Sequence, residues 1–121
     1  MAGLTWVHSV EVPWDILGLK QTMLFAAERM MEMLPPSKKC HQDMETETYL
    51  MSVTSNSNTS LILHHVSRMY TTSTEIHREA IQSFGPRNNH DWTAVFLEYQ
   101  GMMSCAQRQL QKEVDKGDQE Y

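Results

Sequence analysis

The stretch WDILGLKQTMLFAAERMMEML, residues 14–34, contains the strongest helical pattern in the chain. Its apolar residues recur at intervals of three and four, which is the spacing of one face of an α-helix. One row consists of Ile16, Leu19, Met23, Ala26, Met30 and Met33, and a second row beside it consists of Leu17, Leu24 and Met31. Pro35 and Pro36 end this helix, because proline has no backbone N–H to donate. The apolar face is therefore wider than a coiled-coil seam.

Three further segments, residues 37–53, 60–84 and 92–117, also carry helical spacing. The first of them is the weakest, and its apolar stripe consists of Cys40, Met44, Leu50 and Met51, with Glu45 and Glu47 outside it. The other two stripes are nearly unbroken. A polar stretch at residues 52–60 predicts the loop between the second and third helices.

Residues 4–12 alternate loosely between apolar and polar side chains, which is typical of extended backbone. Four helices joined by short connections favour an antiparallel arrangement. We therefore predict an all-α fold, a four-helix antiparallel bundle over residues 14–117. A short extended N-terminal arm at residues 1–13 precedes it, and a frayed tail at residues 118–121 follows it.

The composition limits the kinds of partner. The chain has 121 residues, with 10 Lys and Arg against 15 Asp and Glu, so its formal net charge is −5. Lys38 and Lys39 form the only adjacent basic pair, whereas nucleic-acid binding needs clustered cations to neutralise phosphates. No run of about 18 apolar residues occurs, so a membrane span is not expected. The size is that of one domain. The charge pattern and the short apolar runs predict no nucleic-acid partner and no membrane partner.

Motifs that carry chemistry are absent from the sequence. None of the six histidines stands three or four residues from another, which is the spacing of two metal ligands on one helix face. The chain has no glycine-rich phosphate loop, no G-x-S-x-G and no C-x-x-C. We therefore predict no catalytic, cofactor-binding or metal-binding residues and no small-molecule substrate. The protein is not expected to be an enzyme.

Two cysteines, Cys40 and Cys105, are too few to indicate a disulfide framework. Residues 1–18 lack the basic start and the continuous apolar core of a signal peptide. These features favour an intracellular, cytoplasmic protein. The alternative is a secreted four-helix signalling ligand, which predicts a Cys40–Cys105 bridge and a glycan on Asn58.

Methionine is unusually frequent, with ten residues in the chain. Its flexible, polarizable side chain suits surfaces that accept varied partners, although rows at helical spacing more often face a core. We predict a non-enzymatic helical protein–protein interaction module, a scaffold, adaptor or oligomerisation domain. It would bind a partner helix or a second copy through a Met-rich apolar face beside the first and fourth helices. The candidate contact residues are Ile16, Met23, Met30, Tyr99 and Met103.

Overall fold

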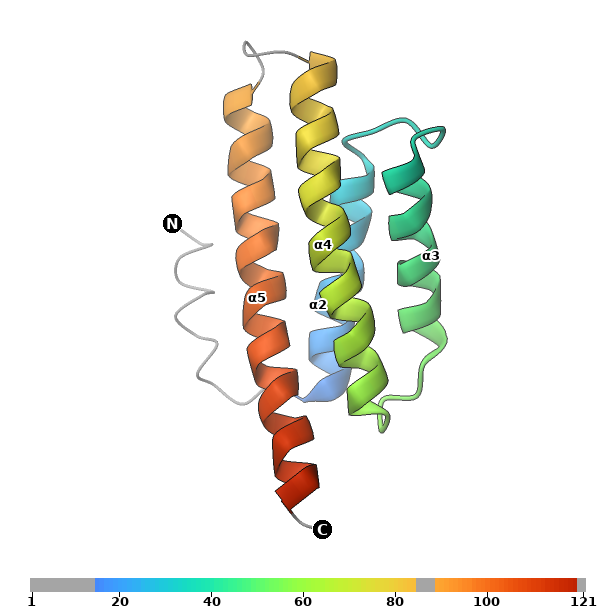
Figure 1. Cartoon of the computed structure of the whole chain (residues 1–121), viewed down its shortest axis with the longest axis vertical. Coiled ribbons are helices and arrows are strands. Elements are labelled where there is room, and N and C mark those ends of the chain that lie inside the picture. The colour runs from blue at the N-terminus through green and yellow to red at the C-terminus, as the bar shows by residue number, and fades with distance from the viewer. Residues whose placement is uncertain (1–14, 85–88, 120–121) are drawn as a thin grey trace.

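The computed structural model describes residues 15–84 and 89–119. Within them the backbone forms four α-helices: α2 (Ile16–Met31), α3 (Lys39–Val53), α4 (Thr59–Phe84) and α5 (Asn89–Gln119). The predicted all-α fold is confirmed, and chain direction alternates from one helix to the next in Figure 1. The predicted N-terminal arm, residues 1–13, lies outside the described residues. α5 continues through Gln119, and residues 120–121 of the predicted tail lie outside the described residues.

The first helix begins and ends for local reasons. The carboxylate of Asp15 accepts a hydrogen bond from the backbone N–H of Gly18 at 2.7 Å, so Asp15 caps α2. The helix ends at Met31, earlier than the apolar pattern suggests. The N–H groups of Met33 and Leu34 donate to carbonyls three residues back, which tightens the chain into a turn. Both side chains still reach the core.

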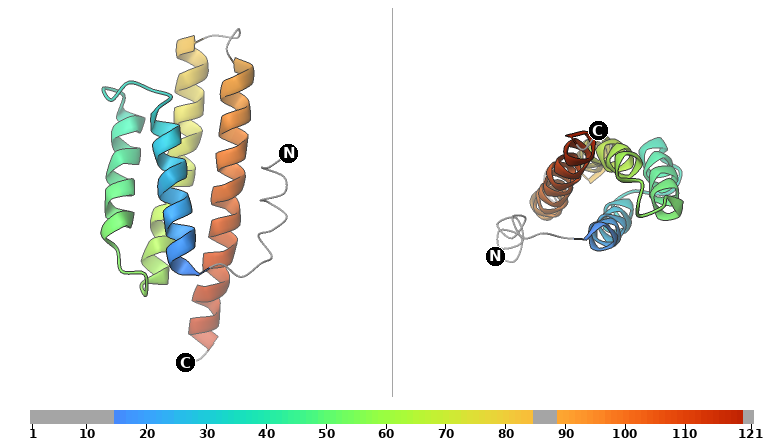
Figure 2. Two further views of the ribbon diagram at one scale, coloured as in Figure 1. Left: turned by 180° about the vertical axis from the view of Figure 1, so that it is seen from behind. Right: turned by 90° about the horizontal axis from the view of Figure 1, so that it is seen from below.

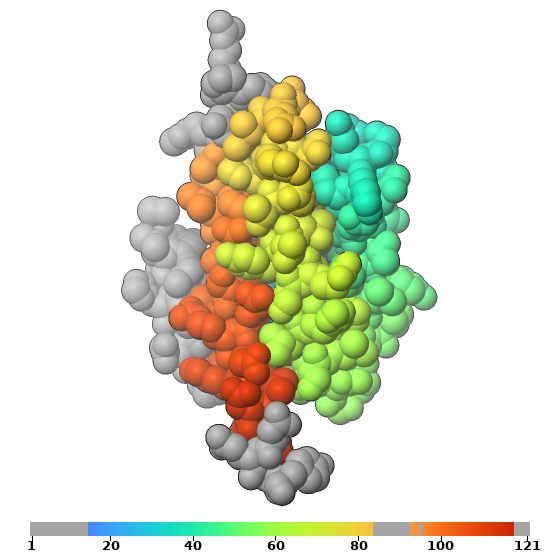
Figure 3. Space-filling view, viewed as in Figure 1, coloured from blue at the N-terminus to red at the C-terminus, as the bar shows by residue number. Residues whose placement is uncertain are grey.

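The helices pack unequally around the core. α4 packs most extensively against α5 and α3, and α2 packs against all three other helices. The Cα atoms of α3 stay more than 8 Å from those of α5. In the space-filling view α3, α4 and α5 form one continuous face (Figure 3), and the ribbon view shows α2 behind α4 (Figure 1). Seen from behind, α2 lies in front, between α3 and α5, so its outer side faces away from the bundle (Figure 2).

The core is rich in methionine. Six methionines are fully buried: Met23, Met30, Met44, Met51, Met69 and Met103. They pack with aliphatic and small side chains from every helix in one cluster. A flexible thioether fills irregular spaces well, which suits a core between helices of unequal packing. The first methionine row of α2, which supplies the predicted contact residues Met23 and Met30, therefore lies in the core.

One prediction about α3 is wrong. Glu47, placed outside the stripe, is only 7% exposed, whereas Leu50, placed inside it, is 37% exposed. The buried row is Cys40, Met44, Glu47 and Met51, which keeps a regular 4-3-4 spacing. The buried carboxylate is stabilised by α4: it lies 2.7 Å from Nδ1 of His65, and Nε of Arg68 donates to it at 2.8 Å.

The predicted Cys40–Cys105 bridge is also wrong. Both cysteines are free and buried. A disulfide requires Cα atoms about 4.4–6.8 Å apart, and Cys40 on α3 is farther than that from any residue of α5. Among the described residues, no helix is long and apolar enough to cross a membrane.

Candidate functional site

The predicted contact residues lie mainly in the core. Met23, Met30 and Met103 are fully buried and Tyr99 is almost so, while Ile16 is half-buried at the edge of the same cluster. Burial raises the pKa of the Tyr99 hydroxyl above its ordinary value. In this folded state the four buried side chains offer no surface to a partner, so contact with them would require α2 and α5 to separate.

The second row of α2 has a different position. Leu17 is 47% exposed, and Leu24 and Met31 are half-buried, packed against the edge of the core. We call Leu17, Leu24 and Met31 the outer row. Their spacing of seven residues places them on one side of the helix, separated by about 10.5 Å along its axis. This row is visible in the sequence, but the predicted contact residues on α2, which are Ile16, Met23 and Met30, belong to the row beside it.

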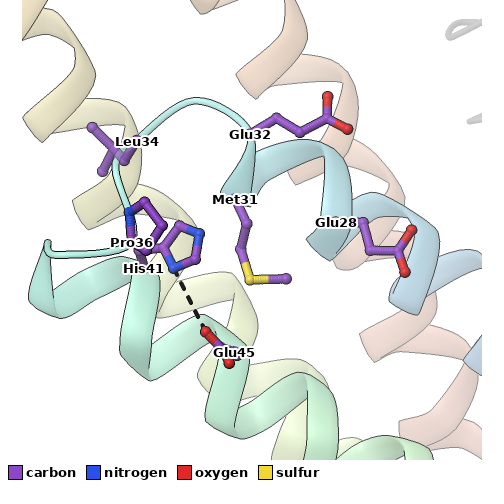
Figure 4. A pocket seen from close by; sticks show the side chains of 7 residues that line it. All are labelled: Glu28, Met31, Glu32, Leu34, Pro36, His41 and Glu45. Atoms are coloured by element: carbon purple, nitrogen blue, oxygen red, sulfur yellow. Dashed lines mark ion pairs between the residues drawn. The ribbon is translucent and has the colours of Figure 1, made fainter.

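The outer row leads into a pocket where α2 ends and α3 begins. The pocket has a volume of about 480 Å³. It is lined by Glu28, Met31 and Glu32 of α2, Leu34 and Pro36 of the turn, and His41 and Glu45 of α3 (Figure 4). We call it the corner pocket. Met31 belongs to both the outer row and the corner pocket, so the two features form one surface.

The α3 wall of the corner pocket holds a half-buried histidine, His41. The side chain of His41 is only 13% exposed, whereas that of Glu45 is 70% exposed. Nδ1 of His41 lies 3.9 Å from Oε2 of Glu45, on the dashed line in Figure 4. This nitrogen is buried and has no hydrogen-bond partner within the described part of the chain. A polar atom in this state is costly for the fold, and such atoms often mark functional sites.

The α2 wall is acidic. Glu28 and Glu32 are four residues apart, so their charges repel each other by about 0.2–0.5 kcal/mol. They also lie at the C-terminal end of α2, where the helix dipole disfavours negative charge. Neither forms an ion pair with another described residue, and no lysine or arginine lines the pocket. The corner pocket is therefore lined by apolar side chains and by three glutamates, of which Glu45 faces His41 at 3.9 Å.

The two lysines where α3 begins are engaged elsewhere. Lys38 forms an ion pair with Glu79 at 3.8 Å, and Lys39 forms one with Asp43 at 3.0 Å. Neither lysine side chain lines the corner pocket, so these two lysines do not neutralise its carboxylates.

Other polar groups in the described residues stabilise the bundle. Nζ of the buried Lys20 donates to the backbone carbonyl of Thr54 at 2.5 Å and to Oδ1 of Asn56 at 3.3 Å, which fastens α2 to the end of α3. A smaller pocket beside Arg68 has a volume of about 250 Å³. No group of three or more His, Cys, Asp or Glu among the described residues is arranged to hold a metal ion.

Comparisons of the chain with models of protein families, with curated proteins and with solved structures found no match. The function is therefore inferred from the geometry of the outer row and the corner pocket.

Proposed function

We propose that the chain is a non-enzymatic protein–protein interaction module that binds a helical segment of a partner along the outer side of α2. The observation that carries the proposal is the outer row, which the core covers only in part: Leu17 is 47% exposed, and Leu24 and Met31 are half-buried. Leu17, Leu24 and Met31 repeat every seven residues, which matches two turns of a partner helix lying along α2. Apolar anchors at this spacing are the usual contacts of a helix bound in a groove.

Charge favours a different protein over a second copy. A symmetric dimer through this surface uses the same patch of each copy. Glu28 and Glu32 border the outer row, so they would repel their counterparts in a dimer whose two α2 helices run parallel. A partner with complementary charge avoids this repulsion. The partner is therefore a separate protein, of the kind that a scaffold or adaptor would bind.

The polar groups buried in the bundle support a binding role over catalysis. Glu47 and His65 are bonded to each other between α3 and α4, and Lys20 is bonded to the end of α3. Their hydrogen bonds hold helices together, and none of the three lines the corner pocket. The features that point outward are apolar side chains and carboxylates, which suit recognition.

A matched pair of surface variants tests this proposal. Leu17→Glu with Leu24→Glu places charges in the outer row, while Val53→Glu places one at an exposed apolar site on α3. Circular dichroism first establishes that each variant is folded. A partner captured by the wild-type chain should then be identified, purified and titrated against all three proteins. We expect Val53→Glu to keep its affinity and the double variant to lose at least tenfold.

Two outcomes would contradict the proposal. Equal affinity of the double variant and the wild type would show that the outer row is not the contact surface. Light scattering over a concentration series gives the second outcome. A dimer of the wild-type chain at micromolar concentration that the double variant abolishes would assign the outer row to self-association.

A further inference from the structure

One buried side chain on α5 has no place in the core of the bundle. Cys105 is only 1% exposed, but it stands outside the core cluster, which holds every other buried apolar side chain that the structure describes. From this burial we infer that the N-terminal segment, residues 1–14, docks on the outer side of α5 and covers Cys105. The contact concerns α5 and not the outer row of α2, so it goes beyond the proposed function and does not depend on it.

The position of Cys105 on its helix explains why the core does not reach it. Nine residues, or two and a half turns, separate it from Phe96, and two residues separate it from Met103, so it points away from both. Phe96 and Met103 belong to the core cluster. Gln107 is also two residues from Cys105, and it donates to Oγ of Ser67 on α4 at 3.1 Å. The thiol therefore faces away from the core and from α4.

The described neighbours on this side of α5 do not account for the burial. Nη2 of Arg108 donates to Sγ of Cys105 at 3.2 Å, but Arg108 is itself exposed and covers the thiol from one side only. Leu97, eight residues before Cys105, is 59% exposed, and Lys112, seven residues after it, is also exposed. The cover is therefore confined to the middle of α5 and comes from chain outside the described residues.

Only the N-terminal segment is placed to supply this cover. Residues 85–88 and 120–121 adjoin the two ends of α5, and each end lies more than about 20 Å from Cys105 along the helix axis. Residues 1–14 lead into the start of α2, which lies level with the C-terminal half of α5 (Figures 1 and 2). Fourteen extended residues span up to about 46 Å, so the segment reaches the middle of α5 with chain to spare.

The composition of the segment suits an apolar contact. Eight of residues 1–14 are apolar, Glu11 is the only one of them that is Asp, Glu, Lys or Arg, and Trp6 and Trp14 are two of the three tryptophans of the chain. Tryptophan buries a large apolar area when it docks. Gly101, one turn before Cys105, has no side chain and allows the segment to approach α5 closely. The short tether to α2 favours the chain's own α5 over that of a second copy.

The rate at which Cys105 is alkylated tests this docking. The full chain is treated with iodoacetamide, and peptide mass spectrometry follows Cys105 and Cys40 separately. Thiol modification depends on access, so the rate at Cys105 measures its cover. Cys40 belongs to the core cluster, so its rate reports any opening of the bundle.

Two matched variants change only the N-terminal segment. Trp6→Asp with Val10→Asp is the test variant, because a spacing of four places both side chains on one side of a helix or a strand. Thr5→Asp with Ser9→Asp is the control, which adds the same charge at the same spacing and keeps both apolar side chains. We expect the test variant to speed alkylation of Cys105 by at least about tenfold, while the control matches the wild type.

Three outcomes would overturn the inference. Alkylation of Cys105 in the wild type as fast as that of free cysteine would show that nothing covers it. Equal rates in the test variant and the wild type would show that the N-terminal segment is not the cover. A wild-type rate that rises on dilution would assign the cover to a second copy. If Cys40 also reacts faster in the test variant, the uncharged pair Trp6→Gln and Val10→Gln takes its place under the same criteria.

Discussion

Replacing Glu47 with alanine should destabilise the bundle strongly, because this side chain joins α3 to α4. Its carboxylate is bonded to His65 at 2.7 Å and to Arg68 at 2.8 Å. The His65 side chain is only 8% exposed and would lose a buried hydrogen bond, which costs about 1–3 kcal/mol. The Arg68 side chain is 61% exposed, so solvent reduces the loss of its ion pair to about 0.5–1 kcal/mol.

The sum is a loss of about 1.5–4 kcal/mol in the free energy of unfolding. For a chain of this size the melting temperature should fall by about 6–16 °C. Urea unfolding followed by circular dichroism at neutral pH measures the change. Arg68→Ala serves as the control, and it should cost less than about 1 kcal/mol because only the solvent-exposed partner is removed.

A second variant separates the buried pair from simple loss of volume. Glu47→Leu with His65→Leu removes both buried polar groups and keeps apolar volume, so its stability should lie within about 1 kcal/mol of the wild type. The reasoning is refuted if Glu47→Ala costs less than about 0.5 kcal/mol. It is also refuted if Arg68→Ala costs as much as Glu47→Ala.

Three further outcomes are expected. Glu32→Lys should raise the free energy of unfolding by about 0.3–1 kcal/mol in urea, because it places a cation at the C-terminus of α2; a decrease would contradict the account of the acidic wall. Burial lowers the pKa of His77 below its ordinary 6.5, and its ring stacks on Phe96. The unfolded chain therefore takes up this proton first, and stability should fall as the pH drops through 6.5 towards the lower folded pKa. His77→Gln should flatten that fall in pH-dependent melts, and an unchanged profile would exclude His77 as its source. Met103→Leu conserves buried volume, so it should lower the free energy of unfolding in urea by less than about 1.5 kcal/mol; a larger loss would contradict the interpretation of this site as an adaptable part of the core.

Regular spacing made the helices predictable, and the errors have physical causes. The 3-4 pattern located all four described helices within a few residues. Glu47 was missed although it continues the 4-3-4 spacing of Cys40, Met44 and Met51. A charged residue is expected to be exposed unless partners stabilise it in the core. The partners of Glu47 are His65 and Arg68, which lie on another helix, so the pattern of α3 alone does not indicate them.

The corner pocket was beyond sequence reasoning for a related reason. His41 and Glu45 are more than eight residues from Glu28 and Glu32 along the chain, and only the geometry of the turn brings these walls together. The outer row, in contrast, was visible in the sequence. What the sequence left open was which of the two rows the core would take, because both have the same spacing and similar hydrophobicity.

The methionine core divides the thioethers of the described residues into two chemical groups. Six are fully enclosed and that of Met33 is nearly so, while those of Met31 and Met102 are half-buried. Mild peroxide converts accessible methionine to its sulfoxide, a polar group that reductases can restore. Met31 forms part of the floor of the corner pocket, so oxidation there would make this apolar floor polar while the enclosed thioethers stay reduced. Peptide mapping after mild oxidation would then show which methionines are accessible in the folded chain.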